Sequence, residues 1–320
     1  MLRILSTRLH QGRRTVPYPA VEPEMPERFR GLPVLDGTRC PEGCGTCEEA
    51  CPTGAFRASP RGLEIDLGRC LFCSDCIQAC PEGAIAYSTD YRLASRSREE
   101  LVMREGQALV LTKALDVKMR RLFGRSLKLR QVSAGGCNAC EADVNVLGTV
   151  VFDLGRFGIQ FVASPRHADG LLITGPVTEN MKLALQKTYD AIPSPKIVVA
   201  VGACAISGGP YIGHAEACGG ADAVVPVDLY VPGCPPHPYT ILDGLLRLLG
   251  RIENGAGKMA WAERMRAAAL EVGEANIREN TQAGVRRADQ AARYLRGVGD
   301  AKEDAWGVAT DEAQSTDGAH

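Results

Sequence analysis

The chain has 320 residues, with 37 Lys and Arg against 38 Asp and Glu, so its net charge is close to zero. A nucleic-acid-binding protein needs a basic face for the phosphates, and an aromatic content of 5% leaves few side chains for base stacking. We therefore expect no nucleic-acid partner. The length predicts two domains, each large enough for its own core.

Thirteen cysteines are many for a chain of this size. In a secreted protein they would indicate disulfides, but arginines interrupt each apolar run near the N-terminus, so no signal-peptide core is expected there. Reduced cytosolic thiols that bind metal are the better interpretation. No window approaches the roughly 20 apolar residues of a membrane-spanning helix.

Residues 1–36 are expected to form an N-terminal arm. Leu2, Leu5 and Leu9 recur at helical spacing among several arginines. This pattern is typical of a helix on a membrane surface or a partner, and equally of a frayed helix that caps its own domain. The stretch from Pro17 to Pro33 carries five prolines and is expected to run extended.

Two cysteine runs lie in residues 37–93. The second, Cys70-Leu-Phe-Cys73-Ser-Asp-Cys76-Ile-Gln-Ala-Cys80-Pro81, has the spacing of a cubane iron–sulfur ligand run. The first, Cys40-Pro-Glu-Gly-Cys44-Gly-Thr-Cys47-Glu-Glu-Ala-Cys51-Pro52, is a near copy with one extra residue. The repeat predicts a small α+β two-cluster ferredoxin-like domain. Its short strands, such as Gly62–Asp66, would alternate with one-turn helices after each proline.

The expected ligand assignment crosses over, because in such units the fourth cysteine of each run binds the other cluster. One cluster would use Cys40, Cys44, Cys47 and Cys80. The other would use Cys70, Cys73, Cys76 and Cys51. Gly43 and Gly45 would absorb the extra residue of the first run. Zinc is the alternative, but structural zinc sites favour two separated cysteine pairs over triple runs that end in Cys-Pro.

Residues 94–126 are polar, basic and helix-prone, and are expected to form a connector with two helices. In residues 127–252 apolar runs alternate with helical patterns, which predicts an open parallel α/β sheet with helices on both faces. The expected strands are Leu127–Val132, Gly170–Thr174, Lys196–Val201 and Asp228–Val231. The expected helices are Thr178–Ala191 and Pro238–Leu249. Residues 253–320 are expected to be helical and then disordered, with no assigned chemistry.

Four further cysteines each follow the carboxyl end of an expected strand: Cys137, Cys140, Cys204 and Cys234. Open α/β sheets gather ligands at this edge, so the four thiols predict a third cluster. Ordinary buried cysteines or a redox dithiol are the alternatives. Cys218 belongs to no motif and is expected to be a packing residue. No GxGxxG or P-loop pattern indicates a nucleotide site.

From Cys137-Asn-Ala-Cys140-Glu-Ala-Asp143 onwards the sequence resembles the small subunits of group 4, membrane-bound nickel–iron hydrogenases. That family includes the formate hydrogenlyase small subunit and is related to the B subunit of respiratory complex I. The resemblance continues through Val-Gly-Ala-Cys204-Ala-Ile-Ser-Gly-Gly and Val-Pro-Gly-Cys234-Pro-Pro-His-Pro and covers about Leu127–Leu249. Residues 18–101 are similar to a two-cluster subunit that is usually a separate chain, which implies a natural fusion.

The resemblance implies a flavodoxin-like sheet on which Cys137, Cys140, Cys204 and Cys234 hold a proximal 4Fe–4S cluster. It implies an electron-transfer subunit with three 4Fe–4S clusters and no catalytic residue of its own. The implied partners are a large subunit with the nickel–iron site, membrane-arm subunits and an electron-donor subunit. They would hold the chain at the inner face of the cell membrane.

Complex I members have adjacent cysteines where this chain has two residues between Cys137 and Cys140, and this difference favours a hydrogenase. The alternatives are a complex I-like NADH/quinone oxidoreductase, a nickel-free hydrogenase-related complex, and a soluble ferredoxin-type carrier. Two positions depart from the resemblance: Asp143 stands where a Glu is usual, and His237 stands where complex I members have Arg. Glu141 and Asp143 are candidates for a proton relay, or for helix-start residues that accept from backbone amides.

Overall fold

The computed structural model describes residues 2–12, 14–41, 43–59 and 62–252. All of them fall in one of the two units into which the chain divides. The other unit, Arg266–His320, lies outside the described residues, and so do the helices and disordered tail expected for residues 253–320.

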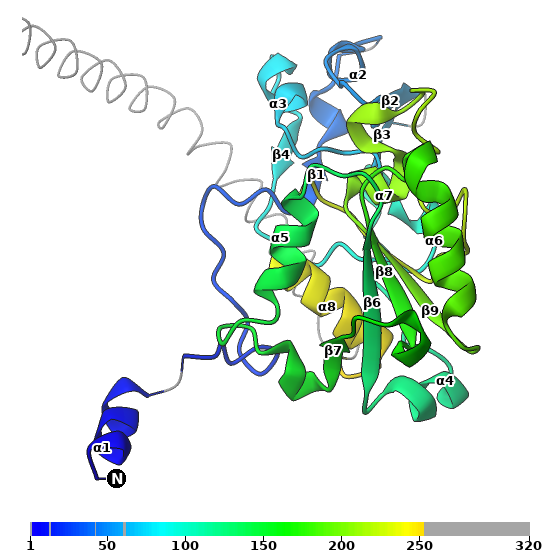
Figure 1. Ribbon diagram of the computed structural model, residues 1–320. Helices are drawn as coiled ribbons and strands as arrows, with labels where there is room; N and C mark the ends of the chain where they lie inside the picture. The colour runs from blue at the N-terminus through cyan, green and yellow to red at the C-terminus, as the bar shows by residue number, and fades with distance from the viewer. Residues whose placement is uncertain (1, 13, 42, 60–61, 253–320) are drawn as a thin grey trace, which may run out of the picture. The chain divides into compact units, whose positions relative to one another are not determined.

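A five-stranded parallel sheet forms the second half of the described chain (Figure 1). Its strands are β6 (Leu127–Ser133), β7 (Ile159–Phe161), β8 (Gly170–Thr174), β9 (Ile197–Val201) and β10 (Leu229–Val231). The spatial order is β10-β9-β8-β6-β7. Counted along the chain this is the order 2-1-3-4-5, which is the flavodoxin-like arrangement, so the predicted fold class is confirmed. The short edge strand β7 was not predicted.

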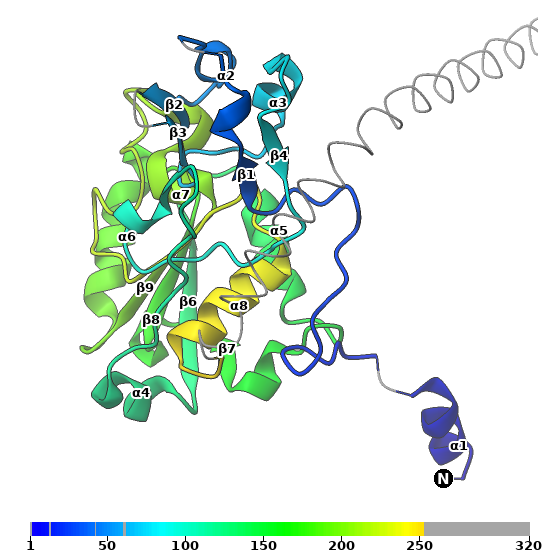
Figure 2. The same cartoon turned by 180° about the vertical axis from the view of Figure 1, so that it is seen from behind.

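Strands β8 and β9 are buried at every position, because helices cover both faces of the sheet. Leu172, Val199 and Val201 lie in one core cluster with α5 (Ala139–Val146) and α8 (Pro238–Leu248). The alternate residues, such as Leu171 and Val198, lie in the other with α6 (Glu179–Ala191) and α7 (Ala203–Ser207). Figures 1 and 2 show α5 and α8 on one side of the sheet and α6 on the other.

The first half contains two small antiparallel sheets. Strand β1 (Pro33–Leu35) pairs with β4 (Ile85–Tyr87), and β2 (Phe56–Ser59), β3 (Gly62–Asp66) and β5 (Val102–Arg104) pair in that order. The short helices are α2 (Thr46–Glu49) and α3 (Asp75–Ala79). They come before Pro52 and Pro81, so the expectation of helices after each proline is wrong. Proline cannot donate the amide that would continue the helix, so each helix ends before it.

Only one of the two helices expected in the connector forms as an α-helix. It is α4 (Val117–Phe123), which begins where the side chain of Asp116 accepts from the amide of Met119 at 3.0 Å. The other expected helix is instead a short 3₁₀ turn, Glu99–Leu101, followed by β5. Met103 in β5 is buried and pairs with Ile65 of β3, so tertiary packing overrides the helical propensity of this segment.

The N-terminal arm contains α1 (Leu2–Gln11), as the leucine spacing predicts. Residues 14–32 contain no helix or strand, and the amide of Val16 donates to the carbonyl of Val151 at 2.9 Å. Among the described residues, no helix combines the length and the apolar character that a bilayer crossing requires.

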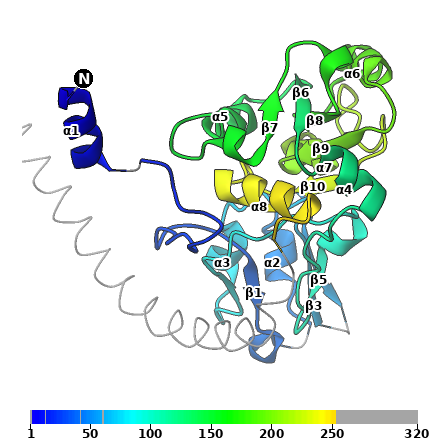
Figure 3. The ribbon, with the colours of Figure 1, turned by 90° about the horizontal axis from the view of Figure 1, so that it is seen from below.

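The two halves share one packed interface. The hydroxyl of Ser207 donates to the carbonyl of Gly68 at 2.8 Å, and Ser95 and Tyr230 exchange backbone hydrogen bonds. The connector also runs beside α8, where the amide of Leu115 donates to the carbonyl of Leu248 (Figure 3). One buried core cluster contains residues of both halves. The cysteine runs of the first half are therefore held in place against the sheet of the second.

Candidate metal cluster sites

All thirteen cysteines carry free thiols. Twelve of them fall into three groups: in each, the charges of three members raise the pKa of a fourth, which is Cys47, Cys76 or Cys140, and no cysteine contributes to the pKa of Cys218. We name these groups the first, second and third sets. Because a thiolate raises the pKa of a second thiol only when the two lie near each other, these influences report which cysteines the fold brings together.

The first set consists of Cys40, Cys44, Cys47 and Cys80. Burial raises the pKa of Cys47 in α2, and the charges of the other three raise it further. Burial likewise raises the pKa of Cys40, with added contributions from Cys44 and Cys80. The last member comes from the second cysteine run, so the fold brings together the thiols that the crossed assignment requires.

The second set consists of Cys51, Cys70, Cys73 and Cys76. Burial raises the pKa of Cys76 to about 12, helped by the charges of the other three thiols. Burial also raises the pKa of Cys70 to about 11, although hydrogen bonds from Phe72 and Tyr87 oppose the shift. Here the fourth member comes from the first cysteine run, the reciprocal of the first set.

The third set consists of Cys137, Cys140, Cys204 and Cys234, which come from the loops and helix starts after three strands of the parallel sheet. Burial raises the pKa of Cys204 to about 11, and the charges of Cys234 and Cys137 add to this. Burial and the same neighbours also raise the pKa of Cys140. Cys137 and Cys234 are exposed, so this set lies at the surface of the chain.

The donor chemistry of the three sets fits iron–sulfur clusters. Four thiols brought this close together need a positive centre among them before they can all be thiolates. Within the described residues, no three His, Cys, Asp or Glu side chains converge closely enough to hold a single metal ion. A four-iron cluster is larger than one ion, and its four ligands stand correspondingly further apart.

Hydrogen bonds to sulfur repeat in the two halves of the ferredoxin-like domain. The amide of Ala55 donates to Sγ of Cys51 at 3.2 Å, and the amide of Ala84 donates to Sγ of Cys80 at 3.4 Å. The two pairs have the same spacing, four residues after the last cysteine of each run. Such bonds stabilise thiolate charge and tune a cluster that binds there.

Three hydroxyl groups next to sulfur were not predicted from the sequence. The hydroxyl oxygen of Thr46 lies 3.4 Å from Sγ of Cys44, that of Thr53 lies 3.7 Å from Cys51, and that of Tyr87 lies 3.7 Å from Cys70. The two threonines stand two residues after a cysteine, which is a local signal. Tyr87 lies 17 positions from its cysteine, so only the fold brings the two together.

A glycine allows the third set to form. Gly202 directly follows β9 with φ of +92°, and a Cβ atom placed there would stand 2.5 Å from Sγ of Cys140. The position therefore requires glycine for its backbone conformation and for the space that the sulfur occupies.

The two candidate proton-relay residues have different surroundings. Glu141 is buried, and its Oε1 accepts from the hydroxyl of Thr174 at 2.6 Å. Burial acts to raise the pKa of Glu141, but hydrogen bonds from Ser133 and Thr174 outweigh it and the pKa is lowered. Burial raises the pKa of Asp143. Asp143 lies in the second turn of α5, which begins at Ala139, so its interpretation as a helix-start residue is wrong.

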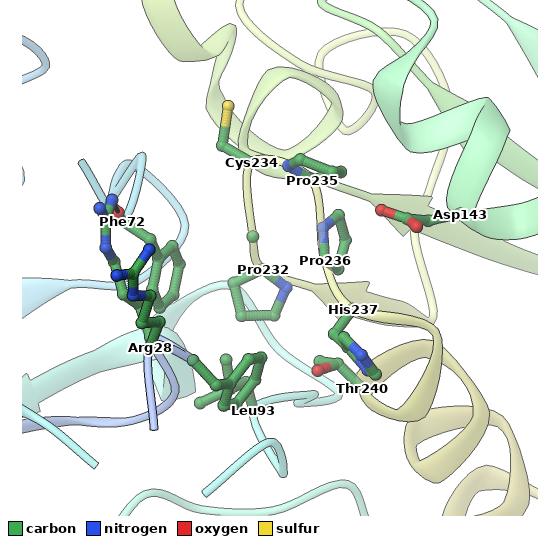
Figure 4. A pocket seen from close by; sticks show the side chains of 13 residues that line it. Arg28, Phe72, Leu93, Asp143, Pro232, Cys234, Pro235, Pro236, His237 and Thr240 are labelled. Atoms are coloured by element: carbon green, nitrogen blue, oxygen red, sulfur yellow. Dashed lines mark hydrogen bonds between the residues drawn. The ribbon is translucent and has the colours of Figure 1, made fainter. Parts of the chain in front are cut away.

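A pocket of about 300 Å³ is lined by Cys234 of the third set and, from the ligand loop of the second set, by Phe72 (Figure 4). Phe72, between two cysteines of the second set, faces the loop Pro232–His237, which carries Cys234. The charge of Cys73 contributes to the raised pKa of Cys234, after burial and Cys137. Asp143 also lines this pocket. The ligand loop of the second set and the Cys234 loop of the third therefore both border this pocket.

His237 closes one side of the pocket and caps α8. Its Nδ1 accepts from the amide of Tyr239 at 3.1 Å, which leaves the proton of the neutral ring on Nε2. Burial lowers the pKa of His237, so the ring is neutral at ordinary pH. It stacks on the ring of Tyr239, with centroids 5.4 Å apart.

Two family models match the chain. Residues 137–248 match the family described as NADH ubiquinone oxidoreductase, 20 Kd subunit. Residues 39–84 match the 4Fe-4S dicluster domain. The two matches contain all twelve cysteines of the three sets.

Several curated proteins resemble part of the chain. Formate hydrogenlyase subunit 7 of Escherichia coli is 47% identical over 142 residues, which are 44% of this chain and 55% of that protein. The probable membrane-bound hydrogenase subunit mbhJ of Pyrococcus furiosus is 40% identical over 41% of this chain and 79% of its own length. An NADH-quinone oxidoreductase subunit of Heliobacterium modesticaldum is 43% identical over 38% of this chain and 71% of its own length. The chain thus spans about half the length of the first of these relatives.

Proposed function

Because this chain belongs to the family of the 20 kDa subunit of NADH ubiquinone oxidoreductase, we propose that it is the electron-transfer subunit of a membrane-bound nickel–iron hydrogenase complex of the formate hydrogenlyase type. The dicluster match makes it an iron–sulfur protein. The single observation that carries the proposal is the division of twelve thiols into three sets of four.

Each set would hold one 4Fe–4S cluster, and bound clusters would supply one-electron transfer. The chain's own residues would fix the order of the sites, with the second set next to the third, because the charge of Cys73 contributes to the raised pKa of Cys234. Amides of Ala55, Phe72 and Ala84 donate to sulfur and would stabilise the ligand charge. The chain on its own would neither produce nor oxidise hydrogen.

Hydrogenase is favoured over quinone reductase by the two-residue spacing between Cys137 and Cys140 and by the identity to formate hydrogenlyase subunit 7. A complex I-like quinone oxidoreductase, or a hydrogenase-related complex without nickel, is the second candidate. The 43% identity to the NADH-quinone oxidoreductase relative supports it. The sequence of the partner large subunit separates the two, because nickel requires two Cys-x2-Cys pairs there.

The proposed partners are a large subunit that carries the nickel–iron site, membrane-arm subunits and an electron donor. Exposed Cys137 and Cys234 support a large subunit over the third set, because an uncovered cluster there would be open to solvent. The donor would meet the first set, at the opposite end of the chain of sites. The complex would hold this chain peripherally at the inner face of the cell membrane.

Anaerobic purification of the native complex tests the proposal. We expect the chain to co-purify with a large subunit that contains nickel, and the complex to evolve hydrogen. A complex with quinone reductase activity and no nickel would support the second candidate. A freely soluble monomer with no large subunit would contradict both and indicate a ferredoxin-type carrier.

A further inference from the structure

Two consecutive residues at the end of the N-terminal arm contact both sides of the pocket that Phe72 and the Cys234 loop line. Nη1 of Arg30 donates to the carbonyl oxygen of Phe72 at 2.6 Å. The ring of Phe29 meets the ring of His237 edge to face, with centroids 5.4 Å apart and planes 77° apart. Both residues line the pocket itself.

The contact of Arg30 lies on the ligand loop of the second set. Phe72 has φ of 53°, in the left-handed region, and its amide donates to Sγ of Cys70 at 3.3 Å. Its ring stacks against Tyr87, whose hydroxyl lies next to the same sulfur. A cationic donor on the Phe72 carbonyl therefore stabilises a strained turn whose amide and neighbouring thiols face the cluster site.

The contact of Phe29 lies on the loop of the third set. His237 follows Cys234 by three residues and is fixed by its bond to the Tyr239 amide. Proline residues at 235 and 236 leave this loop little freedom, so a ring packed against His237 also restrains the position of Cys234.

We propose that Phe29 and Arg30 form a clamp that sets the separation of the second and third cysteine sets. The clamp also raises the reduction potential of the cluster that the second set would hold. This inference rests on the proposed electron-transfer function and adds two positioning residues to it. Neither side chain binds a cluster. Arg30 acts through the Phe72 carbonyl and through its charge, which favours the more negative, reduced form of a nearby cluster.

The test uses the purified complex with the variants Arg30→Gln, Arg30→Lys and Phe29→Ala. Arg57→Gln is the control, since Arg57 is an exposed arginine on β2. Redox titration followed by electron paramagnetic resonance gives the reduced-to-oxidised ratio of each cluster at a fixed potential. In the fully reduced complex the same spectra report the magnetic interaction between the second and third clusters.

We expect Arg30→Gln to lower the reduced-to-oxidised ratio of the second cluster about threefold, because one partly solvated charge is removed. Arg30→Lys should keep most of the wild-type ratio, since lysine keeps the charge. It should still weaken the magnetic interaction, since lysine loses the planar fork that holds the Phe72 carbonyl. Phe29→Ala should weaken the magnetic interaction and leave the ratio of the second cluster nearly unchanged.

The clamp is overturned if Arg30→Gln and Phe29→Ala both match the Arg57→Gln control in ratio and in magnetic interaction while the iron content stays at the wild-type level. That result would leave the proposed function standing. A wild-type complex with fewer than three clusters would instead contradict the proposed function itself, so the two failures are distinguishable.

Discussion

The hydroxyl of Tyr18 donates a hydrogen bond of 2.8 Å to Oδ1 of Asp243, across 225 positions of the chain. Asp243 is 1% exposed, and its Oδ2 accepts from Nε of Arg247 at 2.7 Å. The N-terminal arm is thereby tied to α8, the helix that directly follows the Cys234 loop. A buried carboxylate without these donors would be strongly destabilising.

Replacing Tyr18 by Phe should lower the free energy of unfolding by about 1–3 kcal/mol, because it removes a donor from a buried carboxylate. Denaturant unfolding of the cluster-loaded chain measures the change. Tyr211→Phe is the control, since Tyr211 is 45% exposed. An equal effect of the two substitutions would show that the buried hydrogen bond contributes nothing particular.

Replacing Gly202 by Ala should remove the third cluster and leave the other two, because the new Cβ would occupy the space of the Cys140 sulfur. Iron per chain should fall by about four. Gly213→Ala is the matched control: Gly213 has φ of +78°, and a Cβ there would meet nothing within 4 Å. If both variants keep their full iron content, the inference that a cluster at the third set needs the space beside Gly202 is contradicted.

Replacing His237 by Asn should reduce the loss of stability on acidification. Burial lowers the pKa of His237, so the unfolded chain takes up this proton near pH 6.5 while the folded chain remains neutral. The free energy of unfolding therefore falls as the pH decreases through that value. Asparagine can still accept from the Tyr239 amide but does not titrate. Between about pH 7.5 and 5.5 the free energy of unfolding should decrease less for the variant than for the wild type. Equal decreases would contradict the lowered pKa of His237.

Replacing Cys218 by Ser should leave the iron content unchanged. Its Sγ donates to Oε1 of Glu179 at 3.2 Å, a bond that a serine hydroxyl can also make, and no member of the three sets contributes to its pKa. Metal analysis of the purified variant checks this. A loss of about four irons would mean that Cys218 is a ligand.

Much of the parallel sheet could be predicted because its strands are continuous apolar runs. Gly170–Thr174 was predicted with its observed ends, and the helix predicted at Thr178 begins one residue later. The three-residue edge strand β7 was missed because Ile159–Phe161 is too short to show a period. Val102–Arg104 was wrongly predicted as helix, since its pairing with β3 depends on residues almost 40 positions away.

The cysteine spacing predicted two groups of ligands, and the place of four cysteines after strand ends predicted a third; that these groups hold clusters stays a prediction. No local pattern indicates the residues that lie between the sites. Phe29 and Arg30 carry no motif, and their partners lie more than 40 positions away. Tyr87 likewise lies 17 positions from Cys70. Such contacts arise from tertiary packing, which short-range spacing does not encode.

The most direct measurement of the central claim is the iron and sulfide content of the anaerobically purified chain, compared with Cys204→Ser. We predict about twelve irons and as many sulfides for the wild type, and about eight of each for the variant. Eight in both proteins would contradict a cluster at the third set. Zinc in place of iron would contradict the electron-transfer function altogether.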